Sequence, residues 1–431
     1  MLVTIIAMSN NIITSFRRWD YVKISIFSLA ITALWQSMHW IILQMRLQEF
    51  VPETQKNTYL GLMTLSGLLL AMLAQPIAGA ISDRSSFKWG QRRPFIIIGT
   101  IATLCFLPGV GLAGSFATLF VVYCLLNIAT NTAQGPFQAF IPDLVPRNKY
   151  GLASGVKALL EVIGAVVFVF ITGELMDRYS TGDESLWLWL VILILGVTML
   201  GAMIATALTV KEKPGVPIGR ARSALKALWE TVKEVTAKSE MKWFLVSRAL
   251  IYMAFTTIQT WALYYLEDVI GVETPAGSTA EFAIFGVIGM LAVAWPAGYL
   301  SDKIGRKPII ITAGLLGGLG IGIIYLSQQY NTILWASGLI GIGLGAFNSA
   351  NWALATDLVE KGEEARYLGI ANIATTGGAA LARAIGPAVD HFNSLSVNSG
   401  YDFVLLMCVI YFIVGSLLVL KIRKKTSPSR G

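Results

Sequence analysis

The chain has 431 residues, of which 55% are hydrophobic and only 13% are charged. A soluble domain carries about a quarter charged residues, so this composition excludes an ordinary soluble protein and indicates a chain embedded in lipid. Taken alone, the net charge of +8 suggests a nucleic-acid partner. The distribution of the basic residues, described below, instead relates this charge to the orientation of the chain in a membrane.

Twelve apolar segments follow one another along the chain, and each is long enough to cross a bilayer as a helix. They are 22–45, 57–81, 94–113, 116–140, 150–173, 185–209, 242–266, 282–300, 308–327, 332–355, 366–388 and 402–421. Most connections between them are short, which favours antiparallel neighbours. The sequence therefore predicts an all-α membrane protein with twelve transmembrane helices.

One connection is long and divides the chain into an N-terminal bundle (1–210), a linker (211–241) and a C-terminal bundle (242–431). The linker opens with Pro214-Gly215-Val216-Pro217 and continues as a basic, amphipathic pattern. This pattern fits a helix that lies on the anionic inner leaflet of the membrane. It fits a solvated linker helix equally well.

The basic residues are distributed unevenly across the predicted membrane. Of the 33 Lys and Arg, three fall in loops opposite the amino terminus (Arg46, Lys56 and Arg178) and three fall within spans (Lys157, Arg248 and Arg383). All others lie on the side of the amino terminus, which is the positive-inside pattern. We therefore expect a multi-pass protein of the inner or plasma membrane with both termini in the cytoplasm, and no nucleic-acid partner.

A loop motif occurs once in each half of the chain. The first copy reads G-A-I-S-D-R-S-S-F-K-W-G-Q-R-R-P from Gly79 to Pro94, and the second reads G-Y-L-S-D-K-I-G-R-K-P from Gly298 to Pro308. Glycine permits close helix contact, and the acid can pair with the cations or cap a helix. Such a motif between two apolar helices predicts a tight hairpin.

The spacing of the two copies indicates a duplication. The offset between halves is 219 residues at the motif aspartates and 214 residues at the closing prolines, because the first copy is five residues longer. The offset of 214 still holds at P-D-L-V from Pro142 and T-D-L-V from Thr356. Parallel repeats of six helices describe a transporter with its solute path between the halves.

At these residues the chain resembles the major facilitator superfamily, and more narrowly the sucrose- and glycoside-transporting branch with its bacterial relatives. The strings that carry the narrower resemblance are S-D-R-S-S-F-K-W-G-Q-R-R-P-F-I (82–96) and N-T-A-Q-G-P-F-Q-A-F-I-P-D-L (131–144). The resemblance implies two six-helix pseudo-repeats and a cytoplasmic gate network that favours one access state. The residues that match this gate are Gly79, Asp83, Arg84, Gly90, Arg92 and Arg93, with Gly298, Asp302, Lys303, Gly305, Arg306 and Lys307.

One position departs from the pattern of the plant sucrose carriers. Those carriers have an aspartate in the fourth helix that is associated with proton coupling, and the aligned residue here is Asn127. Asparagine cannot exchange a proton near neutral pH. Proton-coupled sucrose uptake by that route is therefore not expected.

Four charged side chains lie well inside predicted spans, away from the span ends, where each costs about 2.5–3.5 kcal/mol on insertion scales. Lys157 and Glu161 are four residues apart on the fifth helix, hence on one face. Glu161 lies near the middle of the membrane and is a candidate coupling group for a proton or sodium ion; a permanent internal salt bridge is the alternative. Arg248 is close enough to the helix end to snorkel, and Arg383 lies deep in the eleventh helix. For both arginines, an anchoring or helix-bridging role and contact with the solute stay open.

Amide and aromatic side chains form the predicted solute cavity, because amides bond hydroxyl groups and ring faces stack on sugars. In the fourth helix, Asn127, Asn131, Gln134 and Gln138 form one polar stripe. The other candidates are Gln36, His39, Tyr252, Gln259, Asn348, Asn351 and Trp352, with Arg248 and Arg383. An alternative is that the amides only join helices within the lipid.

The sequence has no phosphate-binding glycine loop and no cysteine or histidine metal cluster, so we expect no cofactor, no metal and no enzyme activity. The favoured interpretation is a monomeric secondary transporter that moves a sugar, glycoside or similar polar solute, with a coupling ion possible. Two alternatives are an exporter of amphiphilic compounds and a non-transporting membrane sensor or scaffold.

Overall fold

The structure is a computed structural model that describes residues 18–87, 89–181, 185–212, 239–358 and 364–422. Within these residues the chain is helical and contains no strand. The predicted linker falls mostly on residues 213–238, outside the described part. The all-α membrane fold with twelve spans in two halves is confirmed.

The N-terminal half contains six spans, three of which are built from more than one helical segment. These are α2 (Arg18–Ser37) with the π-helical turn η1 (Met38–Ile42) and α3 (Leu43–Gln48); α4 (Lys56–Asp83); α5 (Arg93–Phe106) with α6 (Pro108–Leu112); α7 (Phe116–Gln138) with α8 (Phe140–Leu144); α9 (Tyr150–Thr181); and α10 (Leu186–Thr209).

The C-terminal half repeats this arrangement. Its spans are α12 (Ser239–Tyr265) with the π-helical turn η4 (Leu266–Ile270); α13 (Pro275–Ile304); α14 (Arg306–Leu326); α15 (Tyr330–Leu358); α16 (Glu364–Arg383) with α17 (Gly386–Leu395); and α18 (Ser399–Leu417) with η5 (Leu418–Lys421). The first span of each half thus contains a π-helical turn, a feature that is frequent at functional sites.

Ten spans in the described residues are long and apolar enough to cross a membrane by composition alone. The remaining two, α12 and α16, carry more polar residues and each contains a buried arginine, Arg248 or Arg383. A helix that carries buried polar groups must direct them to other helices rather than to lipid. The polar character of α12 and α16 therefore places them in the interior of the bundle.

The eleventh span was predicted as one helix over 366–388, and this is wrong. Helix α16 ends at Arg383, and the chain continues as the separate helix α17. Proline favours the first turn of a helix, where its missing N–H group is not needed. Pro387 occupies that place in α17, so a new helix starts where a continuous one was expected.

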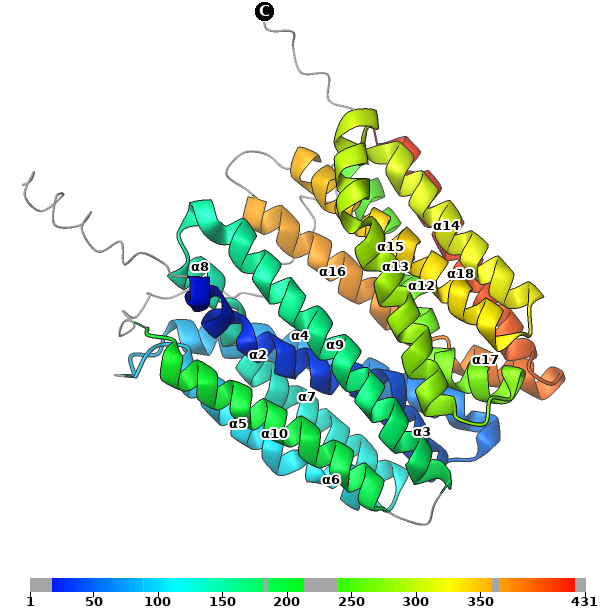
Figure 1. Ribbon diagram of the computed structural model, residues 1–431, viewed down its shortest axis with the longest axis horizontal. Coiled ribbons are helices and arrows are strands. Elements are labelled where there is room, and N and C mark those ends of the chain that lie inside the picture. Colours follow the sequence, from blue (N-terminus) through cyan, green and yellow to red (C-terminus); the bar gives the residue numbers. More distant parts are fainter. Residues whose placement is uncertain (1–17, 88, 182–184, 213–238, 359–363, 423–431) are drawn as a thin grey trace, which may run out of the picture.

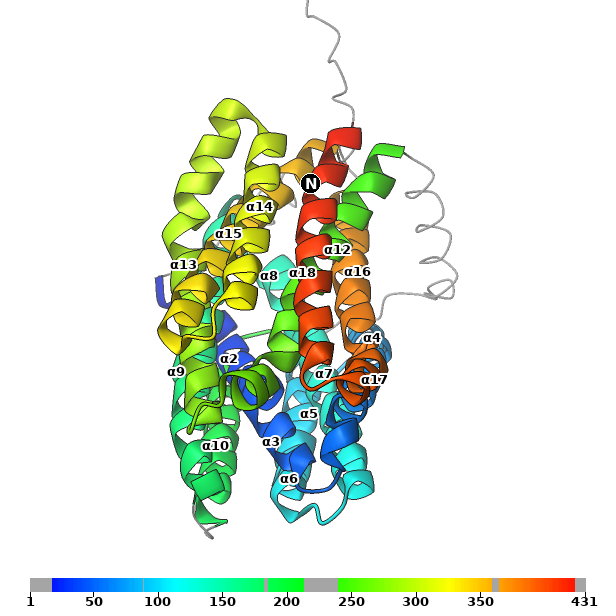
Figure 2. The same ribbon diagram turned by 90° about the vertical axis from the view of Figure 1, so that its right-hand side faces the viewer.

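The two halves lie as two bundles (Figures 1 and 2). Contacts between them are concentrated where α9 meets α13 and where α4 meets α17. We call the end with residues 48–58, 177–179, 266–277 and 390–401 the closed end, and the end with residues 82–87, 89–93, 143–150, 301–307 and 357 the motif end. In the described part of the chain, every hydrogen bond and ion pair between the halves lies at the closed end or near mid-membrane.

Glycine permits a close approach of α4 and α7 in the N-terminal half, but at a position other than the one predicted. A Cβ atom on Gly135 would lie 2.4 Å from the carbonyl oxygen of Gln75, so α7 rests directly on the backbone of α4. A Cβ atom on Gly79, the predicted contact residue, would meet nothing within 4 Å. In this conformation Gly135 therefore supplies the close contact.

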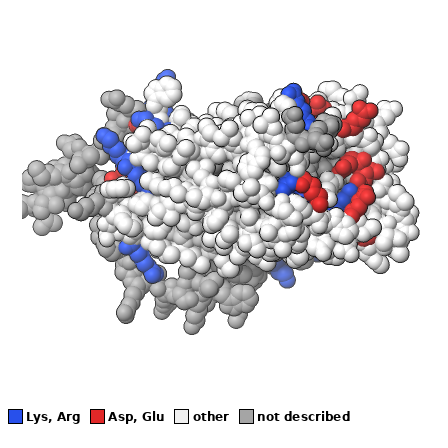
Figure 3. All heavy atoms as spheres, turned by 90° about the horizontal axis from the view of Figure 1, so that it is seen from below, with Lys and Arg blue, Asp and Glu red and all other residues white. Residues whose placement is uncertain are grey.

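Charged side chains are separated along the length of the bundle. On the face seen in Figure 3, acidic side chains gather at the closed end, and basic side chains predominate among the charged ones at the motif end. This separation agrees with the uneven distribution of Lys and Arg in the sequence.

Candidate solute cavity and gate loops

A cavity of about 520 Å³ lies between the two halves. Segments α2, η1, α4 and α7 of the N-terminal half and α16 of the C-terminal half form its wall. Its lining residues are Trp35, His39, Thr64, Leu68, Ala71, Met72, Gln75, Pro76, Tyr123, Asn127, Asn131, Gln134, Asn372, Ile373, Thr376 and Arg383. None of these is acidic, so the described wall of the cavity carries no negative charge.

Three rings form a cluster on one side of the cavity. The ring of Trp35 stacks on His39 at a centroid distance of 5.3 Å and meets Tyr123 edge to face at 5.9 Å. The Nε2 atom of His39 is 3.0 Å from the hydroxyl of Tyr123. The cluster fits closely against α4, because a Cβ atom on Gly67 would lie 2.3 Å from the Tyr123 ring. Such a cluster offers a solute both a ring face and a polar group.

The predicted polar stripe on α7 lines the same cavity through Asn127, Asn131 and Gln134. The Nδ2 atoms of Asn127 and Asn131 each donate to the carbonyl oxygen one turn earlier, at 2.9 Å. These bonds fix the orientation of both amides and leave their oxygen atoms as acceptors for a solute. The arrangement suits hydroxyl groups, which are hydrogen-bond donors.

Arg383 is the charged residue of the cavity wall. Its side chain is 7% exposed, and its Nε atom is buried with no hydrogen-bond partner. Sequence reasoning left open an anchoring role for this residue, and the structure places it in the cavity instead.

Two residues predicted for the cavity pair with each other across the halves. The Nε2 atom of Gln259 on α12 donates to Oε1 of Gln36 on α2 at 2.9 Å. Neither residue lines the cavity in this conformation. Their direct hydrogen bond joins the halves instead.

The other predicted residues of the C-terminal half form a separate polar cluster around Arg248. Its guanidinium donates to Thr375 Oγ1 at 2.8 Å and to Asn351 Oδ1, and it lies over the rings of Tyr252 and Trp352. The hydroxyl of Tyr252 donates to Asn348 Oδ1 at 2.8 Å. Arg248 is 2% exposed, so it does not snorkel to the helix end; it bridges α12 to α15 and α16 through neutral partners, which is one of the roles that the sequence left open.

The predicted pair of Lys157 and Glu161 is formed. Lys157 Nζ lies 3.2 Å from Glu161 Oε1, and both side chains are partly exposed. They line a small cavity with Ser28, Gln134 and Gln138. Since Gln134 also lines the central cavity, one side chain is shared by the two sites.

The first gate loop is held together by Arg92. This guanidinium pairs with Asp83, lies 3.0 Å from Asp143 Oδ2 and donates to Ser82 Oγ at 3.3 Å. Arg84, also predicted for the gate, is exposed and makes no ion pair within the described residues. The predicted network thus exists around Arg92, and its second carboxylate is Asp143, which sequence reasoning noticed only as a repeat landmark.

A further carboxylate, that of Glu212, binds the backbone of the first gate loop. Glu212 accepts hydrogen bonds from the backbone N–H groups of Arg92 (2.7 Å) and Arg93 (3.0 Å). It also lies against Gly90, whose φ of 120° suits glycine. Burial raises the pKa of the Glu212 carboxyl. Sequence reasoning missed Glu212 because it lies more than a hundred residues from the loop that it caps.

The second gate loop reproduces the network of the first. Arg306 pairs with Asp302, lies 3.3 Å from Asp357 Oδ2 and donates to Ser301 Oγ at 2.8 Å. Gly305 has a φ of 100°, like Gly90 in the first loop. The remaining cations differ: Lys303 lies over the Tyr299 ring, and Lys307 donates to the carbonyl oxygen of Ile422. A Cβ atom on Gly298 would have one neighbour, at 3.9 Å, so this glycine is not tightly packed.

Two carboxylates that sequence reasoning missed join the halves at the closed end. Asp177 at the end of α9 accepts from the backbone N–H groups of Ala276 (2.9 Å) and Gly277 (2.7 Å), in the first turn of α13. Asp390 on α17 accepts from backbone N–H groups of Asn57 and Thr58, in the first turn of α4. Each half thus binds a helix N-terminus of the other, where negative charge is favourable. We call these two contacts the crossed latches.

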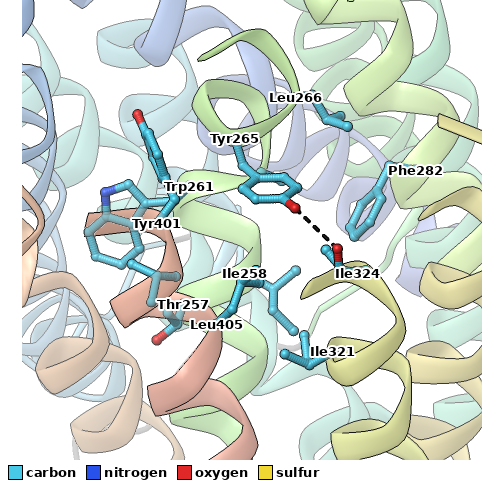
Figure 4. A pocket seen from close by; sticks show the side chains of 12 residues that line it. Thr257, Ile258, Trp261, Tyr265, Leu266, Phe282, Ile321, Ile324, Tyr401 and Leu405 are labelled. Atoms are coloured by element: carbon cyan, nitrogen blue, oxygen red, sulfur yellow. Dashed lines mark hydrogen bonds between the residues drawn. The ribbon is translucent and has the colours of Figure 1, made fainter. Parts of the chain in front are cut away.

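A further cavity, of about 30 Å³, lies within the C-terminal half (Figure 4). Its wall is largely apolar, and Phe282, Ile321 and Leu405 are among the side chains that face it. A space this small holds about one water molecule. It is therefore too small for a sugar. Another cavity of about 520 Å³ lies at the closed end and is lined by Glu49 and Glu267; the central cavity, which contains most of the predicted amide residues of α7, is the candidate solute site.

Comparisons with known proteins agree with this architecture. The sequence model of the family described as "MFS/sugar transport protein" matches residues 36–423. Sucrose transport protein SUT1 of Oryza sativa subsp. japonica is 29% identical over 147 residues, which are 29% of this chain and 26% of that protein. The uncharacterized symporter YnaJ of Bacillus subtilis (strain 168) is 22% identical over 70% of this chain and 66% of its own length.

Solved structures share the fold at low identity. A bacterial homologue of the human lysosomal transporter Spinster, in an inward-facing conformation, superposes with a TM-score of 0.71 at 17% identity, over 96% of this chain and 100% of that one. A D-xylose-proton symporter gives a TM-score of 0.71 at 15% identity, over 94% and 98%. The chain spans only about a quarter of the length of the sucrose transport proteins that it matches. The family match, in contrast, covers most of the chain, which therefore belongs to the MFS/sugar transport protein family.

Proposed function

We propose that this protein is a secondary transporter that works by alternating access and carries a sugar, glycoside or similar polar solute with a cation. The observation that supports this most directly is the central cavity of about 520 Å³, which is lined by residues of both halves. The halves are held together at the closed end, whereas no hydrogen bond or ion pair joins them at the motif end among the described residues. Breaking the crossed latches and forming contacts at the motif end would move the opening from one side to the other.

The chemistry of the wall supports a solute that is rich in hydroxyl groups. The amide oxygens of Asn127 and Asn131 are left as acceptors, and the ring cluster of Trp35, His39 and Tyr123 supplies apolar faces with a hydroxyl beside them. Sugars present hydroxyl groups at their edges and C–H groups on their faces, so they fit both surfaces. Relatives named for sucrose transport are similar to part of this chain, which adds support.

Coupling to a cation is assigned to Glu161 in this proposal. No acidic residue lines the described wall of the central cavity, and Asn127 cannot carry a proton. Glu161 is the nearby carboxylate, and Gln134 lies on the walls of both its small cavity and the central one. A solute bound at Gln134 can therefore affect the Lys157–Glu161 pair directly, and a proton or sodium ion at Glu161 can affect the solute.

The two gate networks would then control access at the motif end. Arg92 and Arg306 hold equivalent pairs of carboxylates within their own halves. The loops on the same side of the membrane as the motif end contain most of the Lys and Arg residues. This distribution favours a motif end that faces the cytoplasm, in the inner or plasma membrane. We propose that the protein acts as a monomer, since the cavity is built within one chain.

The test is uptake by the purified protein in sealed lipid vesicles. We expect radiolabelled sugars to accumulate when an inward proton or sodium gradient is imposed, and to exchange without one. Glu161→Gln should abolish accumulation but keep exchange, whereas Lys23→Gln, which removes an exposed charge that lines neither cavity, should change neither. Efflux of amphiphilic dyes without sugar exchange would favour an exporter. Absence of any flux, with ligand binding intact, would favour a sensor.

A further inference from the structure

The guanidinium of Arg383 faces the cavity without a partner. Within the described residues it makes no hydrogen bond and no ion pair, and its Nε atom is buried and unsatisfied. A buried group of this kind normally costs several kcal/mol unless something compensates it. The structure as it stands provides no such compensation.

Arg248 shows what this fold does with an arginine that has a structural role. That guanidinium is also buried, but it donates to Thr375 and Asn351 and lies between two aromatic rings. Neutral side chains thus provide the hydrogen bonds and ring contacts that keep the Arg248 guanidinium in one position. Arg383, about two turns beyond Thr375 on the same helix, has none of these partners.

The surroundings of Arg383 are suited to a negatively charged ligand. No acidic residue is present among the described residues of the cavity wall, so the cavity has a positive charge that nothing neutralises. The guanidinium fork binds carboxylate and phosphate groups with two parallel hydrogen bonds. Such bonds gain strength where water is scarce.

We propose that Arg383 binds an anionic group of the transported solute, so that the protein selects a hydroxyl-rich solute with one carboxylate or phosphate group over a neutral sugar. This inference rests on the proposed function and refines its substrate class. Asn127 and Asn131 on α7 then bind hydroxyl groups on the opposite wall. A cavity of about 520 Å³ is large enough for such a solute, since small-molecule sites begin at roughly 300 Å³.

The test compares three probes of similar size: D-glucuronate, D-glucose 6-phosphate and D-glucose. Their binding to the purified full-length protein is measured by quenching of tryptophan fluorescence and by isothermal titration. We expect at least one anion to bind ten times more tightly than glucose, and the two anionic probes distinguish a carboxylate from a phosphate. Added salt should weaken binding of the anionic probes more than it weakens binding of glucose.

Variants separate the role of Arg383 from a general effect of charge. Arg383→Gln should bind glucose and the anions equally, Arg383→Lys should keep part of the preference, and Lys23→Gln should keep all of it. Equal binding of glucose and both anions by the wild type overturns the inference without any variant. So does an unchanged preference in Arg383→Gln.

The two proposals fail in distinguishable ways. Uptake of neutral sugars with no preference for an anion would overturn the role of Arg383 and leave the transport proposal intact. Absence of binding and uptake for every probe would overturn both. A thermal-shift measurement on each variant shows that it is folded before binding is compared.

Discussion

The crossed latches at the closed end lead to a prediction about the conformational equilibrium. Asp390 accepts three hydrogen bonds, from the backbone N–H groups of Asn57 (3.3 Å) and Thr58 (2.6 Å) and from Asn57 Nδ2 (2.8 Å). Asp177 accepts two, from Ala276 and Gly277. All five bonds cross between the halves, so they exist only while this end is closed.

Replacing either aspartate by asparagine keeps the shape of the side chain and removes its charge. A hydrogen bond to a charged group contributes about 1.5–3 kcal/mol, against about 1 kcal/mol for a neutral one. With two or three bonds in each latch, and a helix N-terminus that favours negative charge, each substitution should weaken the closed end by about 2 kcal/mol. That corresponds to roughly a 30-fold shift of the equilibrium between access states, since 1.36 kcal/mol is tenfold.

Distances between spin labels measure this shift. Thr54 and Val397 are exposed residues of opposite halves at the closed end, so cysteines there can carry labels once the three native cysteines are replaced. We expect Asp177→Asn and Asp390→Asn each to add a longer distance, and the double variant to shift most of the population. An unchanged distance distribution in the double variant would refute this account of the closed end.

Three further predictions concern the cavity and the gate loops. Gly67→Ala should push the Tyr123 ring away from His39 and weaken sugar binding several-fold, as measured by isothermal titration. Gly201→Ala is the control and should have no effect, because the added Cβ atom would meet nothing within 4 Å. Arg92→Ala should lower the melting temperature more than Arg306→Ala, because Arg92 is the more deeply buried of the two. Burial raises the pKa of the Glu212 carboxyl in the folded protein above its ordinary value near 4.5. The ionised carboxylate therefore destabilises the folded state at pH values above the raised pKa, and this penalty is lost as the pH falls from the raised pKa to about 4.5. Over that pH range the melting temperature of the wild type should rise relative to that of Glu212→Gln.

Local repetition is the reason that the ion-pair networks of the two motif loops could be predicted from the sequence. Arg92 and Asp143 are 51 residues apart, as are Arg306 and Asp357, and the structure shows the same contacts around the two arginines. A hairpin brings its own residues together, so neighbours in sequence become neighbours in space. Glu212 joins the first loop from a distant part of the chain, and nothing in the loop itself indicates it.

Helix rotation is what the sequence could not specify. In lipid, apolar side chains cover both the lipid-facing and the buried faces of a helix, so periodicity does not show which way a polar residue points. Arg248 and Arg383 therefore looked equivalent, yet one is satisfied inside the bundle and the other faces the cavity. Gln36 and Gln259 were assigned to the cavity for the same reason and instead bind each other.

The structure combines a symmetric frame with an asymmetric cavity. The gate networks and the crossed latches each occur twice, once from each half, as expected if movement of the halves derives from the duplication. The cavity wall does not repeat: the N-terminal half supplies the rings and the α7 amides, and the C-terminal half supplies the charge of Arg383. In the proposed transport cycle, a solute that binds both walls would connect the halves, and its binding free energy would differ between access states because the distance between the walls would change. Such a difference is what allows a solute to drive a conformational change, so in this proposal the asymmetric wall makes the movement of the symmetric frame depend on the solute.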